Sequence, residues 1–165
     1  MRRSRIIIMV IIIAVAIPLF LRWYGPSYHQ PISYNHMLHI EQGLECSYCH
    51  RYVMKETFAT IPGIEVCMEC HEEALTESGE EEKIRQYAEA GTEIPWIQVY
   101  EVPDHVFFSH RRHTSVAGIA CEECHGDVEN RRKPFTRAQV NLSMDFCIDC
   151  HIKNGATEDC VACHR

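Results

Sequence analysis

The chain has 165 residues, enough for one compact domain, and its formal charge at pH 7 is −7. Four of the sixteen Lys and Arg residues flank an apolar stretch at the N-terminus, so the remainder carries twelve basic against twenty-three acidic side chains. This balance argues against nucleic acid as a partner, because phosphate binding needs a basic face. Ten cysteines in a chain of this size indicate disulfides, metal sites or covalent cofactor attachment.

Residues 1–24 are predicted to form a transmembrane signal-anchor. Residues 1–5 contain three arginines, residues 6–21 are all apolar, and residues 22–24 are Arg-Trp-Tyr. Sixteen apolar residues are slightly short for a span of about 20, but arginine extends its charge to the headgroups, and Trp and Tyr suit the membrane interface. The basic N-terminus is expected to stay in the cytoplasm, which places residues 25–165 on the periplasmic, outer side of the inner membrane.

A cleaved signal peptide is the alternative interpretation of this segment. Ala14-Val15-Ala16 matches the small-x-small cleavage pattern that follows a basic and apolar leader. Cleavage there would leave an exposed Ile-Pro-Leu-Phe-Leu end, which favours the uncleaved anchor. Both interpretations export the rest of the chain.

The exported part repeats one order of signals after a short linker marked by Pro26 and Pro31. A His-x-x-His pair followed by two Cys-x-x-Cys-His motifs occupies about residues 30–90, and the same order with a third motif added occupies about residues 91–165. Such self-similarity predicts one structural unit used twice.

The link between the two units begins with a strongly charged stretch, residues 72–90, which predicts a solvated surface helix ended by Gly91. Sustained period-two alternation is absent from the sequence, which predicts little sheet. The expected fold class is therefore mainly α with much irregular structure, as a small domain behind one N-terminal transmembrane helix.

All ten cysteines lie in Cys-x-x-Cys-His motifs. Two thiols one helical turn apart can add to the two vinyl groups of one haem, and the adjacent His then reaches the iron as its proximal ligand. The expected domain is therefore a small multihaem domain. The sequence predicts five c-type haems, attached at Cys46 and Cys49, Cys67 and Cys70, Cys121 and Cys124, Cys147 and Cys150, and Cys160 and Cys163. The proximal iron ligands are then His50, His71, His125, His151 and His164.

Zinc or disulfides are the alternatives for these cysteines. Zinc sites need two Cys-x-x-Cys pairs, or one pair and two spaced histidines, and five pairs do not divide into four-cysteine sites. Neither zinc nor disulfides account for a His after every second Cys. Haem also explains how so thin a set of apolar residues could fold, because each haem is a large apolar plate. We therefore expect a chain that folds only with haem bound.

Six histidines lie outside the motifs, for five irons. Residues three apart share one helical face, so each His-x-x-His pair can present two imidazoles to two neighbouring haems. This predicts four distal ligands: His36, His39, His110 and His113. For the fifth, His105 is favoured over Met144, a thioether alternative that would raise that haem's potential, and over His29 near the membrane. An open fifth site is the remaining possibility.

A His-x-x-His pair followed closely by Cys-x-x-Cys-His resembles the multihaem class III cytochromes c and their three-haem relatives. In that family the first His of the pair ligates the haem of the next motif, and the second serves a different haem. The resemblance implies that His36 pairs with His50 and His110 with His125. His39 and His113 would then ligate two of the haems attached at the other three motifs.

A closer likeness covers almost the whole exported part. Its distinctive segments are Gln30-Pro31-Ile32 before Asn35-His36, Ile61-Pro62-Gly63 before Cys67, Ile94-Pro95-Trp96, the run from Pro103 to His110, and Leu142-Ser143-Met144 before Cys147. Together they resemble the pentahaem subunit of alternative complex III and the haem subunit of the quinone reductase complex of sulfate reducers. The resemblance implies one membrane helix, an iron–sulfur/molybdopterin-like partner subunit and quinone-binding integral membrane subunits.

The leading functional hypothesis is electron transfer within a membrane menaquinol/quinone oxidoreductase complex, between a quinone-linked partner and a soluble cytochrome or other redox carrier in the periplasm. No residue is expected to act as acid, base or nucleophile, since the redox chemistry belongs to the haem. The alternatives are a multihaem reductase with an open iron and a stand-alone quinol dehydrogenase. Six spare histidines for five irons argue against the reductase, and the paired His-x-x-His elements argue against the single-helix tetrahaem quinol dehydrogenases.

Overall fold

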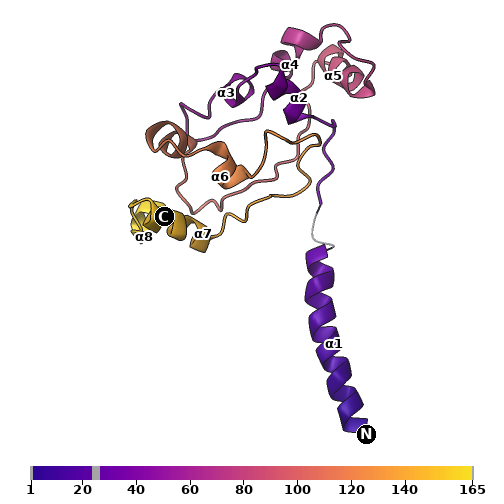
Figure 1. The fold of residues 1–165 in the computed structure, drawn as a ribbon. Coiled ribbons are helices and arrows are strands. Elements are labelled where there is room, and N and C mark those ends of the chain that lie inside the picture. Colours follow the sequence, from indigo (N-terminus) through magenta and orange to yellow (C-terminus); the bar gives the residue numbers. More distant parts are fainter. Residues whose placement is uncertain (1, 24–26, 165) are drawn as a thin grey trace.

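The computed structural model describes residues 2–23 and 27–164, and the side chains of residues 6–18 and 27–164. Within these residues the chain forms short helices joined by long irregular segments (Figure 1). In chain order they are α1 (Arg2–Trp23), α2 (His36–Glu41), α3 (Cys46–Cys49), α4 (Ile64–His71), α5 (Gly79–Glu89), the π-helix η1 (Arg112–Val116), α6 (Cys121–His125), α7 (Met144–Lys153) and α8 (Cys160–Cys163). The one isolated β-bridge in the described part joins Val106 to His164.

Helix α1 contains most of the predicted anchor and stands apart from the rest of the chain in Figure 1. Its large apolar side chains between Ile6 and Ile17 are 46–60% exposed. Tyr24 and Pro26, at the end of the predicted anchor and in the linker, lie outside the described residues. Across residues 2–23 and 27–164, no helix reaches the combination of length and hydrophobicity needed to cross a membrane.

The charged link does form a helix, α5, although it begins at Gly79 rather than near Glu72. The Ser78 hydroxyl accepts a hydrogen bond from Glu80 N, and three glutamates occupy the first turn, where the helix dipole favours negative charge. Gly91, in the left-handed region at φ +64°, follows the last turn. The expectation of a fully solvated helix was wrong in part, because Ile84 and Glu81 are buried.

The buried face of α5 belongs to a small apolar core beside α4, which packs against it. Ile32, Ile84 and Ile94 form the centre of this core, and Cys67 and Trp96 are among the residues around it. Only two other apolar side chains of the described residues, Val53 and Val66, are buried. The polypeptide therefore makes little core of its own, as the sequence predicted.

Shortening Ile32 to alanine is expected to lower the free energy of unfolding of the haem-loaded protein by about 2–5 kcal/mol, because a buried isoleucine leaves a cavity. Ile32 is 2% exposed and joins the segment before α2 to α5. The measurement is denaturant unfolding followed by far-UV circular dichroism. Val116→Ala, at a side chain that is 72% exposed, is the control and should change stability by less than about 0.5 kcal/mol. Equal effects of the two substitutions would contradict this core assignment.

Candidate metal centres

Each Cys-x-x-Cys motif lies on a helical turn. Two motifs form helices of their own, α3 and α8, and the others lie in α4, α6 and α7. In α3 and α8 the backbone N–H of the following histidine donates to the carbonyl of the first cysteine, at 2.9 Å for His50 and 2.8 Å for His164. All ten cysteines are unbridged. One helical turn thus brings both sulfurs to one side, the arrangement that thioether attachment to a porphyrin edge needs.

The imidazoles of four motif histidines each face a histidine from elsewhere in the chain. Ring centres are 6.2 Å apart for His39 and His71, 6.4 Å for His110 and His125, 6.2 Å for His113 and His151, and 5.5 Å for His105 and His164. A metal ion with nitrogen ligands at about 2.0 Å on opposite sides separates two such ring centres by roughly 6 Å. These spacings fit a haem iron between the rings.

The fifth pair implied by the resemblance is His36 with His50. Burial and then the neighbouring His50 lower the pKa of His36 to about 4. Burial also lowers the pKa of His110 and of His125. These imidazoles are therefore neutral at pH 7, and neutral imidazole is the form that binds a metal.

Five of the paired histidines have Nδ1 fixed by a backbone carbonyl. The acceptors are the carbonyls of Asn35 for His39 (2.8 Å), Thr60 for His50 (2.9 Å), Thr57 for His110 (3.1 Å), Ser109 for His113 (2.8 Å) and Thr157 for His151 (2.5 Å). When Nδ1 donates to a carbonyl, Nε2 carries the lone pair and is free to bind a metal. The tautomer that haem ligation requires is thus set by the protein backbone.

Among the described residues, no group of three or more His, Cys, Asp and Glu side chains converges on a metal-sized site. A haem iron takes four nitrogens from the porphyrin, so the protein supplies no more than the two axial ligands. The histidine pairs would supply those two. When bound, the group would supply reversible one-electron transfer.

An aromatic residue two positions before each His-x-x-His pair holds both imidazoles, a feature that the sequence interpretation missed. The Tyr34 ring meets His36 edge-on at 4.7 Å and stacks on His39 at 4.5 Å. Phe108 does the same with His110 at 4.9 Å and His113 at 4.7 Å. The sequence signal that could have predicted this contact is the aromatic residue two positions before the first histidine of each pair. The same local geometry occurs in both units.

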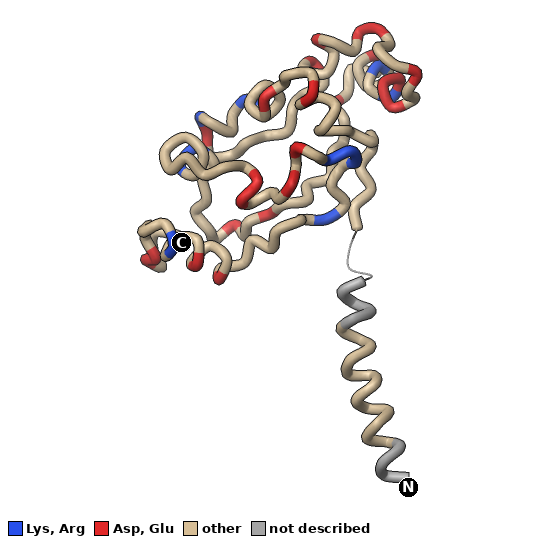
Figure 2. Tube along the Cα trace, viewed as in Figure 1, with Lys and Arg blue, Asp and Glu red and all other residues tan. Residues whose placement is uncertain are grey.

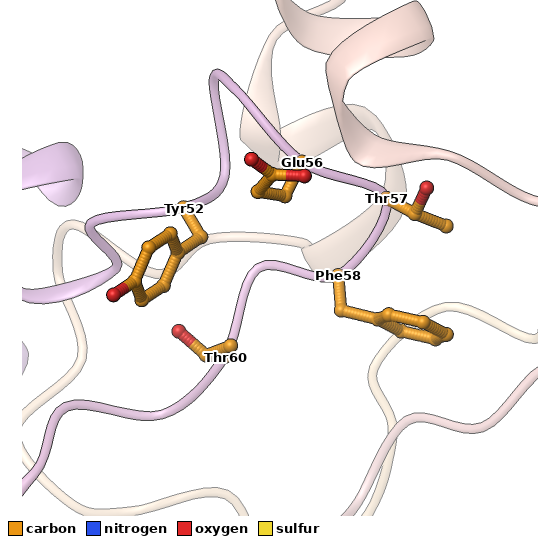
Figure 3. Close-up of a pocket in the computed structure, with 5 residues that line it drawn as sticks. All are labelled: Tyr52, Glu56, Thr57, Phe58 and Thr60. Atoms are coloured by element: carbon orange, nitrogen blue, oxygen red, sulfur yellow. The ribbon is translucent and has the colours of Figure 1, made fainter.

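The loop between α3 and α4 fixes one motif histidine, His50, and one histidine outside the motifs, His110. Its Thr60 carbonyl accepts from His50, and its Thr57 carbonyl accepts from both the ring and the backbone N–H of His110. Figure 3 shows this loop around a shallow hollow lined by Tyr52, Glu56, Thr57, Phe58 and Thr60. The hollow lies on the solvent side, since Phe58 is 75% exposed. We therefore assign the loop a positioning role.

Thr60 adopts a left-handed backbone conformation, φ +61°, which is strained for a β-branched residue. Proline at this position, which locks φ near −65°, would swing the carbonyl away from His50. Thr60→Pro is expected to lower the free energy of unfolding by more than about 1 kcal/mol and to alter the low-spin electron paramagnetic resonance signal of one haem. Thr60→Gly, which removes the strain and keeps the carbonyl, should leave the spectrum unchanged. A normal spectrum for the proline variant would show that this carbonyl does not orient His50.

The three candidates for the fifth distal ligand have different surroundings. His105 stacks on His164, and the chain beside it is fixed by the Val106–His164 bridge and by a 2.7 Å hydrogen bond from Phe107 N to the Cys163 carbonyl. Met144 is 61% exposed at the start of α7, and His29 is exposed. Of the three candidates, His105 is the one that the structure places beside a motif histidine, His164.

Comparison with known proteins agrees with this chemistry. Residues 106–165 match the family described as cytochrome c7 and related cytochrome c. The chain is also 30% identical, over 161 aligned positions that span 82% of this chain and 77% of the relative, to the menaquinone reductase multihaem cytochrome c subunit of Nitratidesulfovibrio vulgaris strain Hildenborough. The prediction of a mainly helical multihaem domain is confirmed. The chain belongs to the multihaem cytochromes c related to this menaquinone reductase subunit, and it transfers electrons through covalently attached c-type haems.

Proposed function

We propose that the chain carries five haems in a continuous row and is the membrane-anchored cytochrome subunit of a menaquinol/quinone oxidoreductase complex. The attachment cysteines are those of the five motifs, and the axial pairs are His36 with His50, His39 with His71, His110 with His125, His113 with His151 and His105 with His164. The row would conduct electrons between a quinone-linked subunit and a periplasmic redox carrier.

The observation that carries this proposal is the order in which cysteines of different motifs adjoin. Burial, and then nearby Cys49, raises the pKa of the Cys67 thiol, and burial and nearby Cys46 raise that of Cys121. The pKa of Cys124 is raised in the same way by burial and by nearby Cys150 and Cys147, and Cys163 is among the neighbours that raise the pKa of Cys147. Taken together, these neighbours order the motifs as second, first, third, fourth and fifth. Every motif thus adjoins the next in the row, and the second and fifth motifs are its ends.

The histidines also support the placement of the first motif beside the third. His50, of the first motif, lies close enough to His110 and His125, the pair of the third motif, to contribute to the lowering of their pKa values. Figure 1 shows α4, which carries the second motif, and α8, which carries the fifth, at opposite ends of the domain, with α3 and α6 between them. A row with two distant ends can accept electrons at one end and deliver them at the other.

The proposed anchor is α1. Its apolar side chains are exposed, which costs free energy in water and is relieved in lipid or against an apolar partner. The basic residues at the start of α1 would hold the N-terminus in the cytoplasm and place the haem domain on the periplasmic side. The similar protein is by name a subunit of a menaquinone reductase, which supports partner subunits here. We assign these as an iron–sulfur/molybdopterin-like subunit and quinone-binding membrane subunits.

The soluble partner is proposed from charge. Acidic side chains are spread along the haem domain, whereas Lys and Arg gather in a few places (Figure 2). An acidic surface attracts a basic carrier and speeds its encounter. A soluble cytochrome or another basic redox carrier fits this surface.

The test is purification of the detergent-solubilised chain from its native membrane, with mass spectrometry of every chain that accompanies it. We expect five haems on this chain, the partner subunits named above, and reduction of all five haems by menaquinol. A chain that purifies alone with its haems intact, and that menaquinol reduces without partners, would instead favour the stand-alone quinol dehydrogenase. Bare thiols would overturn both.

A further inference from the structure

A carboxylate lies beside the imidazole of His71. No hydrogen-bond partner for the buried Nδ1 of His71 is found among the described residues, and the same holds for the buried Nδ1 of His36. The nearest charged group is the carboxylate of Glu81, whose Oε2 lies 3.7 Å away. Both side chains are largely shielded from solvent, at 15% and 10% exposure. Five other paired histidines donate Nδ1 to a neutral carbonyl, so a carboxylate next to His71 is a departure from the common arrangement.

Glu81 is the one charged residue of the described chain that is buried. Three hydrogen bonds fix the position of its carboxylate. Its Oε2 accepts the backbone N–H of Leu75 at 2.8 Å and of Thr76 at 3.3 Å, and its Oε1 accepts the Thr76 hydroxyl at 2.5 Å. The segment between α4 and α5 therefore wraps around this carboxylate and holds it beside His71. A carboxylate that only capped this segment would not need to face a buried imidazole.

A carboxylate close to a metal-binding imidazole acts on the metal through charge and through the basicity of the ligand. The ferric state carries one more positive charge than the ferrous state, so a fixed negative charge stabilises it more. Shielding from solvent strengthens the effect. The expected consequence is a lower reduction potential at the iron that His71 binds, since second-shell contacts are among the protein's means of setting haem potential.

We propose that Glu81 is a positioning residue for His71 and that its carboxylate lowers the reduction potential of the haem attached at Cys67 and Cys70. The inference rests on the proposed function in taking His71 as an iron ligand. That haem is one end of the proposed row. With the Glu81 charge beside it, the haem would be a stronger reductant than the same haem without that charge.

The experiment is a spectroelectrochemical redox titration of the full, haem-loaded chain at fixed pH, comparing the unaltered protein with Glu81→Gln. Glutamine keeps the shape but lacks the charge: its carbonyl oxygen can still accept from the backbone N–H groups of Leu75 and Thr76, and its amide group can donate to the Thr76 hydroxyl. At a given potential, the ratio of reduced to oxidised haem is expected to rise about tenfold for one haem, which is a shift of about 59 mV for a one-electron couple. The other couples should shift by much less.

Two control variants separate charge from structure. Glu82→Gln removes the same charge one residue away on α5, where the side chain pairs with Arg85 and is exposed, and should move no couple. Thr76→Val removes a hydrogen bond to Glu81 but keeps its charge, and should shift the couple by less than half as much as Glu81→Gln. If Thr76→Val has the larger effect, the role of Glu81 is structural and the inference is wrong.

The affected haem is identified in a His39→Met background, because thioether ligation raises the potential of the haem that His39 serves and so marks it. Glu81→Gln should then move the marked couple. If five low-spin haems are present and Glu81→Gln moves no couple, or moves an unmarked one, the inference is overturned and the proposed function stands. If mass spectrometry finds no haem at Cys67 and Cys70, both are overturned.

Discussion

Replacing Cys46 and Cys49 together by alanine is expected to divide the row of haems into two parts that no longer exchange electrons rapidly. In the proposed order the first motif lies between the second and the third, since Cys49 lies near Cys67 and Cys46 lies near Cys121. Removing its attachment site separates the haem of the second motif from the haems of the third, fourth and fifth motifs. Haem content should fall by one fifth, and rapid-mixing reduction by the menaquinol-linked complex should show two separated phases.

The matched control is the double replacement of Cys160 and Cys163 by alanine. It also removes one attachment site, but at an end of the row, because Cys147 adjoins Cys163 and the fifth motif adjoins no other in the proposed order. Its four remaining haems should stay connected and be reduced in a single phase. A single phase in both variants would contradict the proposed order, while two phases in the end variant would place the fifth motif inside the row.

Replacing His105 by alanine is expected to convert one haem from six-coordinate low-spin to five-coordinate high-spin. The His105 ring lies 5.5 Å from that of His164, with 22° between the ring planes. Its loss would leave the iron bound by His164 with an open position. Ferrous protein should then bind carbon monoxide at one fifth of its haem, and the ferric protein should show a new high-spin electron paramagnetic resonance signal.

The fold around His105 should survive this change, because main-chain contacts from Val106 and Phe107 fix the segment without the imidazole. Met144→Leu and His29→Ala are the controls and should leave every haem low-spin and closed to carbon monoxide. If Met144→Leu opens a haem while His105→Ala does not, the thioether is the fifth ligand. Carbon monoxide binding by the unaltered protein would revive the multihaem reductase hypothesis.

Local features of the fold were predictable because they depend on neighbours in the chain. Ser78 and Gly91 delimit α5 as N-terminal and C-terminal signals do in general, and each Cys-x-x-Cys pair spans one helical turn. The prediction for α5 was wrong in part because it depended on local sequence alone. Charge density along residues 72–90 predicted a solvated helix, but Ile84 meets Ile32 and Ile94, which are remote in sequence, and Glu81 is buried with it.

The sequence by itself determined the kind of chemistry of this protein, covalently attached c-type haem, and it predicted where each haem attaches and which histidines are spare. That chemistry is covalent and local, so spacing within a few residues suffices to specify it. Only the tertiary structure decided which spare imidazole faces which motif, that the first motif adjoins both the second and the third, and that a carboxylate rather than a carbonyl stands beside His71. These depend on loop carbonyls and a core drawn from distant segments, and no local spacing encodes such contacts.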